Sequence, residues 1–248
     1  MWTYEKVMIM GRKFEVRKEA MQKTHLKRSK LYARYGKAIY MKAKEGGVNV
    51  ETNHALKHLL ERAKKDDVPN DVVERNLKKA QEKGGEDFET ARYEGFGPGG
   101  SAFLIDALTD NVNRTVSDVR YCFTKIGSKI GVKGSVEHMY DHLAKLHIKG
   151  IDEDDVLETL FAEDIELYDI ETDEEGIFLT AAGTAHDAIE RTLREQDVEI
   201  LYSNSGWYPQ NTVELSDEEY ALFEKLMRLL NDVDDVQAVY HNVEMKDE

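Results

Sequence analysis

Residues 92–115 read RYEGFGPGGSAFLIDALTDNVNRT, and this stretch joins two halves of the chain that differ in charge. Its glycine-rich turn, residues 95–100, leads into the apolar run Ala102–Leu108, which is short, bounded by turn residues and typical of a buried strand. Residues 109–114 are polar and predict a loop. The next helix is predicted to begin at Thr115, with Asp118 three residues later as its capping-box partner.

The charge of the chain changes sign along its length. Residues 1–84 carry 21 Lys and Arg against 11 Asp and Glu, a net charge of +10, whereas residues 85–248 carry 13 against 38, a net charge of −25. A basic module joined to an acidic body is the asymmetry expected of a chain that meets nucleic acid at one end only. The alternative is a basic helix whose charges are simply solvated.

The sequence lacks a cysteine pair, a long apolar run and a secretory signal, and these features together predict the compartment of the protein. Cys122 is the single cysteine, so an intrachain disulfide is excluded. The chain has no apolar run of ~18 residues, so no membrane span is expected. No apolar segment with a small-residue cleavage site follows Met1, so no secretory signal is expected. A reducing, cytoplasmic location fits these observations.

The N-terminal part predicts a basic helical domain over residues 10–85. Residues 1–9 differ in character from this domain and are expected to be a disordered extension, with Met10 as an alternative natural start. Residues 11–29 contain too few apolar side chains to fold without a partner. The residues after them place apolar side chains at helical spacing, so we expect an amphipathic helix that ends at Gly46-Gly47.

Two more helices are predicted on either side of the turn at Pro69. Thr52 or Asn53 is expected to cap the first helix, and Asn70 the second. Two helices joined by a short turn can resemble a helix-turn-helix DNA reader, although most helical hairpins read no base. The polar candidates for base contacts on the second helix do not share one face: Asn70, Arg75, Asn76 and Gln81.

The acidic segment after Ile148 predicts a compact α+β unit. Its expected elements are a helix at 152–163, strands at 165–170 and 176–181, a helix at 185–195 and a strand at 198–202. In the first of these helices the side chains expected to point inward are Val156, Leu157, Leu160 and Phe161.

The elements on either side of this unit predict a second one. Alternating residues predict a strand at 135–140, and the C-terminal residues predict a strand at 212–215, a helix capped by Ser216 with Glu219, and a last strand at 236–243. The element order predicts an α+β protein: an all-helical N-terminal domain, then two ferredoxin-like plaits, the third domain inserted in the second. The expected boundaries are 10–85 for the helical domain, 86–146 plus 208–248 for the second domain, and 147–207 for the acidic insert.

Several segments, in this order, resemble one protein family. They are Met10-Gly11-Arg12-Lys13, Val68-Pro69, residues 93–100 (YEGFGPGG), residues 108–115 (LTDNVNRT), Gly134-Ser135-Val136, residues 209–213 (PQNTV) and residues 234–242 (DDVQAVYHN). Over residues 10–245 the chain resembles the YebC/PmpR family of probable transcriptional regulators, closer to its YeeN-like branch. The resemblance implies three domains with the third inserted in the second, a cytoplasmic location and nucleic-acid-linked regulation. Because mitochondrial relatives are regarded as translational activators, it leaves DNA, RNA and the ribosome open as targets.

The chain departs from the family at its N-terminus. Many members begin with a Gly-His-Ser-Lys-Trp arm, where this chain has Gly11-Arg12-Lys13-Phe14-Glu15. An aromatic residue is kept as Phe14, but stacking by tryptophan cannot be transferred to this chain.

The basic arm supplies most of the candidate binding residues, because Lys and Arg neutralise phosphates and release counterions. Tyr32, Tyr35 and Tyr40 lie among these charges and could stack on unpaired bases, although core packing is favoured for Tyr35. At the end of the central strand, polar contacts to nucleic acid and loop capping are equally open interpretations. The candidate nucleic-acid-binding residues are Arg12, Lys13, Phe14, Arg17, Lys18, Lys23, Lys27, Arg28, Lys30, Arg34, Lys37, Asn111, Asn113 and Arg114.

Other chemistry receives little support from the sequence. Residues 95–100 are neither a P-loop nor a dinucleotide fingerprint, because no Gly-Lys-Ser/Thr follows and the glycines precede a strand. His54 and His58 stand four apart on a predicted helix, but no Cys or Glu at ligand spacing completes a metal site. Cys122 is expected to be a small core residue. No catalytic arrangement is evident, so we expect no enzyme activity, no metal and no cofactor.

The favoured function is a DNA-binding transcriptional regulator that acts through its basic helical domain. The alternative is a translation factor that binds rRNA or tRNA on the ribosome, and a third possibility is an adaptor whose basic arm meets an acidic protein. The acidic C-terminal domains are expected to meet protein partners and to disfavour self-association, so a monomer is expected.

Overall fold

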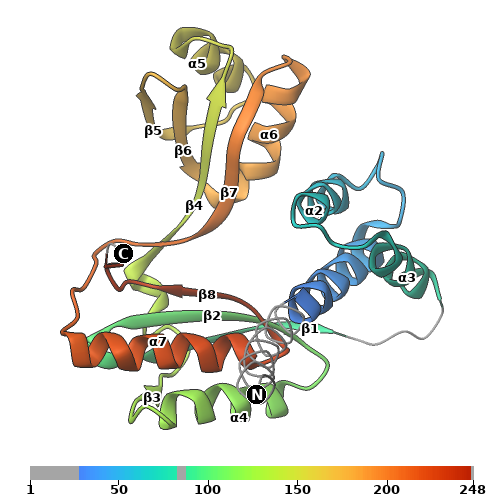
Figure 1. The fold of residues 1–248 in the computed structure, drawn as a ribbon. Coiled ribbons are helices and arrows are strands. Elements are labelled where there is room, and N and C mark those ends of the chain that lie inside the picture. The colour runs from blue at the N-terminus through green and yellow to red at the C-terminus, as the bar shows by residue number, and fades with distance from the viewer. Residues whose placement is uncertain (1–27, 83–87, 247–248) are drawn as a thin grey trace, which may run out of the picture. The chain divides into compact units, whose positions relative to one another are not determined.

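The computed structural model describes residues 28–82 and 88–246. The chain divides into two compact units, residues 1–88 and residues 89–248. In the first unit the described residues form three helices, which cover residues 28–46, α2 (His54–Lys65) and α3 (Asn70–Gln81) (Figure 1). Their apolar faces meet in one core, whose buried residues are Tyr35, Ile39, Ala43, Leu56, Ala63, Val68 and Val72.

Asn53 connects the first described helix to α2. Its side-chain oxygen accepts a hydrogen bond from the Leu56 backbone N–H at 3.0 Å and so caps α2. Its Nδ2 donates to the backbone oxygens of Lys42 and Gly47, both at 2.7 Å. Of the two predicted caps, Asn53 is therefore the one that caps α2. Its buried amide nitrogen also donates the two hydrogen bonds to Lys42 and Gly47, which a threonine hydroxyl could not supply.

The predicted cap of α3 is wrong by one position. Pro69 occupies the N-cap position with φ −60°, and Asn70 is already the first helical residue. No side-chain bond caps this helix. The fixed φ of proline prepares the chain for a helix, so the turn sets the start of α3 without a polar cap.

The second unit contains a four-stranded antiparallel sheet with the order β3-β1-β2-β8. Its strands are β1 (Glu89–Phe96), β2 (Ala102–Thr109), β3 (Lys129–Ile130) and β8 (Val236–His241). Two helices, α4 (Val112–Thr124) and α7 (Asp217–Asp232), cover one face of this sheet (Figure 1). The predicted strand at 102–108 is confirmed as β2, which lies between β1 and β8.

Strand β1 was not predicted from the sequence. It forms a hairpin with β2 through the glycine-rich turn, in which Gly99 has φ 61° and Gly100 has φ 76°. These left-handed conformations suit glycine, so the predicted tight turn is confirmed. Gly95 has a different role: a Cβ there would lie 2.6 Å from the Phe123 ring, so glycine lets α4 pack directly against β1.

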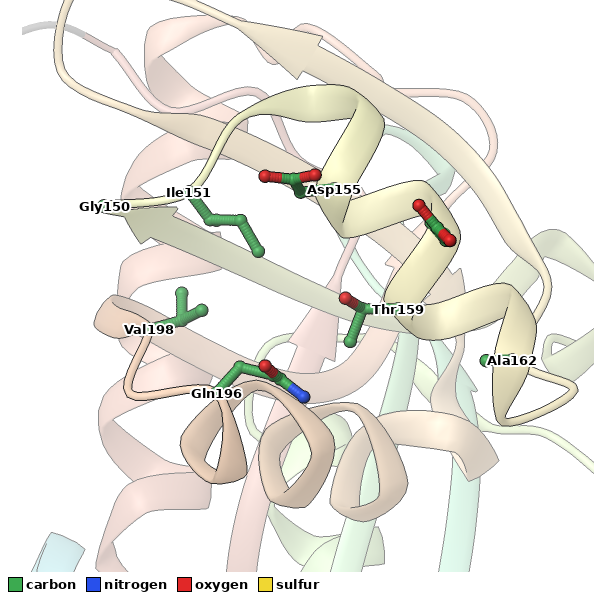
Figure 2. Close-up of a pocket in the computed structure, with 8 residues that line it drawn as sticks. Gly150, Ile151, Asp155, Thr159, Ala162, Gln196 and Val198 are labelled. Atoms are coloured by element: carbon green, nitrogen blue, oxygen red, sulfur yellow. The ribbon is translucent and has the colours of Figure 1, made fainter.

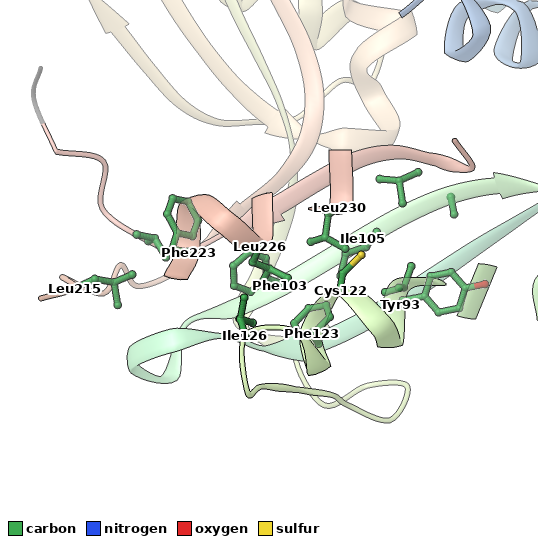
Figure 3. Packing of buried hydrophobic residues seen from close by; sticks show 14 residues of the cluster. Tyr93, Phe103, Ile105, Cys122, Phe123, Ile126, Leu215, Phe223, Leu226 and Leu230 are labelled. Carbon is green, nitrogen blue, oxygen red and sulfur yellow. The ribbon is translucent and has the colours of Figure 1, made fainter. Parts of the chain in front are cut away.

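Three phenylalanine rings lie within the core between this sheet and its two helices (Figure 3). Phe103 of β2 contacts Phe123 of α4 edge to face, with ring centroids 5.8 Å apart, and Phe223 of α7 at 6.1 Å. All three rings are at most 2% exposed. Cys122 is also buried in this core, as predicted, and burial raises the pKa of its thiol to about 11.

Helix α4 begins earlier than predicted. Its first residue is Val112, and the Asn111 side chain caps it by accepting a hydrogen bond from the Arg114 backbone N–H at 3.1 Å. Thr115 is therefore inside the helix and is not its cap. Its hydroxyl is buried and bonded to Thr109 and Asp235, which explains why a threonine stands there without capping.

The second sheet of this unit has the strand order β5-β6-β4-β7. Its elements follow one another as β4 (Tyr140–Lys149), α5 (Glu153–Ala162), β5 (Leu167–Thr172), β6 (Ile177–Ala182), α6 (His186–Glu195) and β7 (Glu199–Pro209). This β-α-β-β-α-β order is that of a ferredoxin-like plait, with both helices packed on one face (Figure 1). The α+β fold class is thus confirmed.

Two predicted strands are wrong. Residues 137–139 form a short 3-10 helix instead of a strand, because the alternating side chains there belong to a tight turn before β4. Residues 212–215 form only an isolated bridge, Val213 to Val243, since β8 already occupies the edge next to β2. The first sheet obtains its fourth strand from the β1–β2 hairpin.

The acidic plait begins with β4, which starts at Tyr140 and pairs with both β6 and β7. This strand starts before residue 147, where the sequence suggested a domain boundary, and the division into domains itself stays a prediction. In α5 the inward face is narrower than predicted. Val156 and Leu160 are buried, whereas Leu157 is 40% and Phe161 81% exposed, because α5 packs along one narrow stripe.

Glu94 of strand β1 is hydrogen-bonded to the loop that leads to β4. The buried Glu94 carboxylate accepts hydrogen bonds from the backbone N–H groups of Gly134 (2.5 Å), Val136 (2.6 Å) and Glu137 (3.0 Å). Burial alone would raise the pKa of Glu94, but these three bonds lower it below its ordinary value. Two separate motifs of the sequence, YEG at 93–95 and GSV at 134–136, therefore meet in one interaction.

Candidate nucleic-acid interface

The predicted interface lies only in part within the described residues. Seven of its members lie outside them and stay predictions: Arg12, Lys13, Phe14, Arg17, Lys18, Lys23 and Lys27. Arg28, Lys30, Arg34 and Lys37 lie on the helix of residues 28–46, where Arg28 is exposed and the other three are half-buried. Residues 28–82 contain 13 Lys and Arg against 8 Asp and Glu, a net charge of +5.

Two of the candidate stacking tyrosines are core residues. Tyr35 is 9% exposed and its hydroxyl donates to the Asp66 carboxylate, which confirms its predicted packing role. Burial, and then the bond to Asp66, raises the pKa of Tyr35 to about 12. Tyr40 is 1% exposed, so the prediction that it could stack on a base is wrong. Tyr32 remains half-buried and is accessible to a ligand.

A pocket of about 410 Å³ lies between the helix of residues 28–46 and α3. We call it the helical-unit pocket. Its lining residues are Ser29, Tyr32, Ala33, Gly36, Lys37, Tyr40, Val72, Arg75, Asn76, Lys79 and Phe88.

Gly36 permits the close approach of the two helices beside this pocket. A Cβ on Gly36 would lie 2.8 Å from Nδ2 of Asn76. That nitrogen donates to the Val72 backbone oxygen at 2.8 Å, which fixes the orientation of the amide. The carbonyl oxygen of Asn76 is left as an acceptor at the lining of the pocket.

Cations and aromatic rings alternate around the helical-unit pocket. The Lys37 ammonium lies 5.6 Å from the centroid of the Phe88 ring, and the Lys79 ammonium lies 5.8 Å from that of Tyr40. Phe88 meets Tyr40 edge to face at 5.8 Å. The described residues that line the pocket include Lys37, Arg75 and Lys79 and no Asp or Glu, so the described lining carries positive charge.

Sequence reasoning missed most of this pocket. From the sequence, Arg75 and Asn76 are candidates for base contacts in a DNA groove, but they do not share one helix face with Asn70 and Gln81. The structure instead brings Arg75, Asn76 and Lys79 to the pocket from consecutive turns of α3. The spacing of Arg75 and Lys79, four apart on a helix, was the available signal.

The polar residues at the end of β2 make internal bonds. Nη2 of Arg114 contacts Asp110 at 2.6 Å and Asp235 at 2.9 Å, and these carboxylates raise the pKa of the guanidinium. Asp235 also accepts bonds from the hydroxyls of Thr109 (3.1 Å) and Thr115 (2.8 Å). Asn111 caps α4, while Asn113 is exposed on the first turn of that helix. Loop capping is thus observed for Asn111, and binding of nucleic acid by Asn111, Asn113 and Arg114 stays a prediction.

A second pocket, of about 520 Å³, lies in the acidic plait (Figure 2). Asp155, Glu158 and Thr159 line it from α5, and Gln196 and Val198 line it from the turn after α6. Residues 140–209 carry 4 Lys and Arg against 19 Asp and Glu, a net charge of −15. Such a surface repels phosphate and suits a cationic partner.

The described residues contain neither a cluster of metal ligands nor a helix that could cross a membrane. Residues 28–82 and 88–246 contain no group of three His, Cys, Asp or Glu side chains that could hold a metal ion. No helix in the same part of the chain has both the length and the apolar character that a membrane crossing needs.

The chain consists of a basic helical unit followed by two antiparallel sheets with their helices. One of these sheets belongs to a plait that is inserted before the last helix and strand of the other. This arrangement defines a specific class of protein. The family model described as "TACO1/YebC second and third domain" matches residues 88–243, and the one described as "TACO1/YebC protein N-terminal domain" matches residues 12–83. The chain therefore belongs to the TACO1/YebC family.

Relatives and a solved structure agree with this assignment. A probable transcriptional regulatory protein of Vibrio parahaemolyticus is 48% identical over 238 residues, which cover 95% of this chain and 100% of the relative. One of Alteromonas mediterranea with the same description is 46% identical over 235 residues, which cover 94% of this chain and 98% of the relative. The crystal structure of a conserved hypothetical protein from Aquifex aeolicus matches with a TM-score of 0.70 and 33% identity, covering 89% of this chain and 92% of that one.

Proposed function

We propose that this protein is a cytoplasmic regulator that binds nucleic acid through its N-terminal helical unit, with DNA as the target and transcription as the process. The observation that carries the proposal is the helical-unit pocket, where Lys37, Arg75 and Lys79 gather among described lining residues that include no carboxylate. Phosphate contacts by such residues supply affinity that does not depend on sequence and that falls with salt. The names of the relatives support transcription as the regulated process.

The acidic plait has a different role in this proposal. Its charge of −15 disfavours contact with phosphate, so we propose that it meets a cationic protein partner. The pocket lined by Asp155 and Glu158 is the position for that contact. The protein acts as a monomer and through binding alone, without a catalytic step.

An RNA target is the second candidate, and one observation favours it. Tyr32 and Phe88 line the helical-unit pocket as half-buried rings, and aromatic rings stack on unpaired bases, which are more common in RNA. A ribosomal or transfer RNA would then replace DNA as the ligand of the same unit.

Crosslinking in cells separates these targets. The full-length protein would be crosslinked, purified and its bound nucleic acid sequenced, in parallel with a variant in which Arg75 and Lys79 are changed to Glu. A control variant carries Lys133→Glu and Lys149→Glu, two exposed lysines of the second unit. Discrete DNA peaks that only the first variant loses support transcriptional regulation. If the bound nucleic acid is instead a few rRNA or tRNA positions, and only the first variant loses them, the RNA target is supported. If neither DNA peaks nor RNA positions are recovered, both targets are refuted.

A further inference from the structure

We propose that the helical-unit pocket binds one unpaired nucleotide, with its base against the accessible parts of the Tyr32 and Phe88 rings and its phosphate at the cations that lie beside these rings. This inference rests on the proposed function, because it names the ligand of the same unit. The unpaired nucleotide can come from single-stranded RNA or from locally opened DNA, and the chemistry of recognition is shared.

The shape of the site favours a single nucleotide over a duplex. A groove-reading protein inserts a projecting helix into the major groove of DNA, which is about 12 Å wide. Here the cations lie around a hollow between two helices, which a duplex cannot enter. A volume of about 410 Å³ falls within the range of ordinary small-ligand sites.

Two aromatic rings of the pocket are suited to a base. Tyr32 and Phe88 are half-buried, so each ring is held by its neighbours and still accessible. Tyr40 is fully buried, and Phe88 packs against it edge to face. Beside these rings the helix carries Ala33, whose small, exposed side chain leaves room for a flat ligand.

The polar residues complete the match to a nucleotide. Lys37, Arg75 and Lys79 supply the positive charge for one phosphate, and a guanidinium can also stack on a base. The Asn76 amide is oriented by its bond to Val72, so its carbonyl oxygen is available to accept a hydrogen bond from an exocyclic amino group. Ser29, exposed at the pocket, adds a hydroxyl.

The test uses the full-length protein and a variant that fills the pocket, Ala33→Trp. Ala33 is exposed on the helix and lines the pocket, so a tryptophan there occupies the space of the base without changing any charge. Phe88→Ala removes one ring, and Tyr168→Ala, an exposed ring of the acidic plait, is the matched control. Circular dichroism and thermal unfolding verify that each variant is folded.

Binding would be measured by fluorescence anisotropy with 12-nucleotide single strands of RNA and of DNA and with the corresponding duplexes. A 2-aminopurine at one position reports stacking directly. We expect the single strands to bind about tenfold or more tightly than the duplex, since one stacked base contributes on that order. Ala33→Trp and Phe88→Ala should abolish this preference and the 2-aminopurine signal, whereas Tyr168→Ala should retain both.

The outcomes separate this inference from the proposed function. If Ala33→Trp binds single strands as tightly as the unchanged protein, with the same 2-aminopurine signal, the pocket is not the site of the base. Salt-dependent binding that persists without a preference for single strands overturns the inference and leaves the proposed function in place. Absence of binding to every oligonucleotide overturns both. A preference for RNA over DNA single strands would identify the source of the nucleotide.

Discussion

Replacing Glu94 by Gln should destabilise the second unit by about 2–3 kcal/mol. Glutamine can keep the bonds from Val136 and Glu137, but its NH2 group then faces the Gly134 N–H, which loses its acceptor. An orphaned donor costs about 1–3 kcal/mol, and loss of the negative charge weakens the two remaining bonds. Glu89→Gln is the control, because Glu89 is exposed on the same strand and should change stability by less than about 0.5 kcal/mol.

Equilibrium unfolding in urea, followed by tryptophan fluorescence, measures this difference. Trp207 packs in the small apolar cluster that includes Val136, so it reports on the loop that Glu94 fastens. A loss below about 0.5 kcal/mol for Glu94→Gln would show that the three hydrogen bonds do not stabilise the fold and would refute the reasoning.

The same carboxylate predicts a pH dependence of stability. The pKa of Glu94 is lowered in the folded protein, from an ordinary value of 4.5, so the unfolded chain binds its proton more readily. Its stabilisation is complete above the ordinary pKa and is lost as the pH falls through the lowered folded pKa. Because glutamine does not titrate, the difference in stability between the unchanged protein and Glu94→Gln should shrink as the pH falls below about 4.5.

Three further predictions concern single side chains. Asn53→Ala should destabilise the helical unit by about 2–3 kcal/mol in hydrogen exchange, since it removes a cap and two buried bonds, whereas Thr52→Ala should cost less than about 0.5 kcal/mol. Arg92→Ala should cost about 1–2 kcal/mol and shift the emission of Trp207, because the guanidinium binds two carboxylates and lies 4.3 Å from the centroid of that ring. Cys122 should resist a thiol reagent at pH 8 in the native protein and react fully in urea, since burial raises its pKa to about 11; fast native reaction would contradict its burial.

Periodicity predicted the elements that are buried on a clear face. Strand β2 is apolar apart from Asp106 and Thr109, because both of its faces are covered. The helix capped by Ser216 with Glu219 begins where the capping box predicts. Strand β1 was missed because its polar residues break the alternation. Arg92 and Glu94 point to the face of the sheet where they bind Glu137 and the loop at 134–137, and these partners are distant in sequence.

The helical-unit pocket could not be predicted for a related reason. Lys37 comes from one helix, Arg75 and Lys79 from another, and Phe88 from the segment after them. Local patterns describe each helix alone and do not give the contact between Gly36 and Asn76 that sets how the helices meet. The charge asymmetry predicts that the N-terminal part of the chain binds nucleic acid, whereas the pocket proposed for that binding is formed only when the helices pack together.

The acidic plait also carries exposed aromatic rings on its sheet. On the acidic plait Phe178 is 41% and Tyr202 51% exposed, and Phe178 stacks on His147 at 3.9 Å between neighbouring strands. A ferredoxin-like plait with rings on its sheet is a common RNA-binding surface, so geometry by itself would favour this face.

The net charge of the acidic plait argues against nucleic-acid binding on this face. A net charge of −15 repels phosphates, and at physiological salt screening removes this repulsion only beyond about 8 Å. Tyr202→Ala should therefore leave the binding of single strands unchanged, whereas Phe88→Ala should weaken it about tenfold. The opposite result, weakened binding by Tyr202→Ala with Phe88→Ala unaffected, would place the nucleic acid on the acidic plait and would show that stacking outweighs net charge in this family.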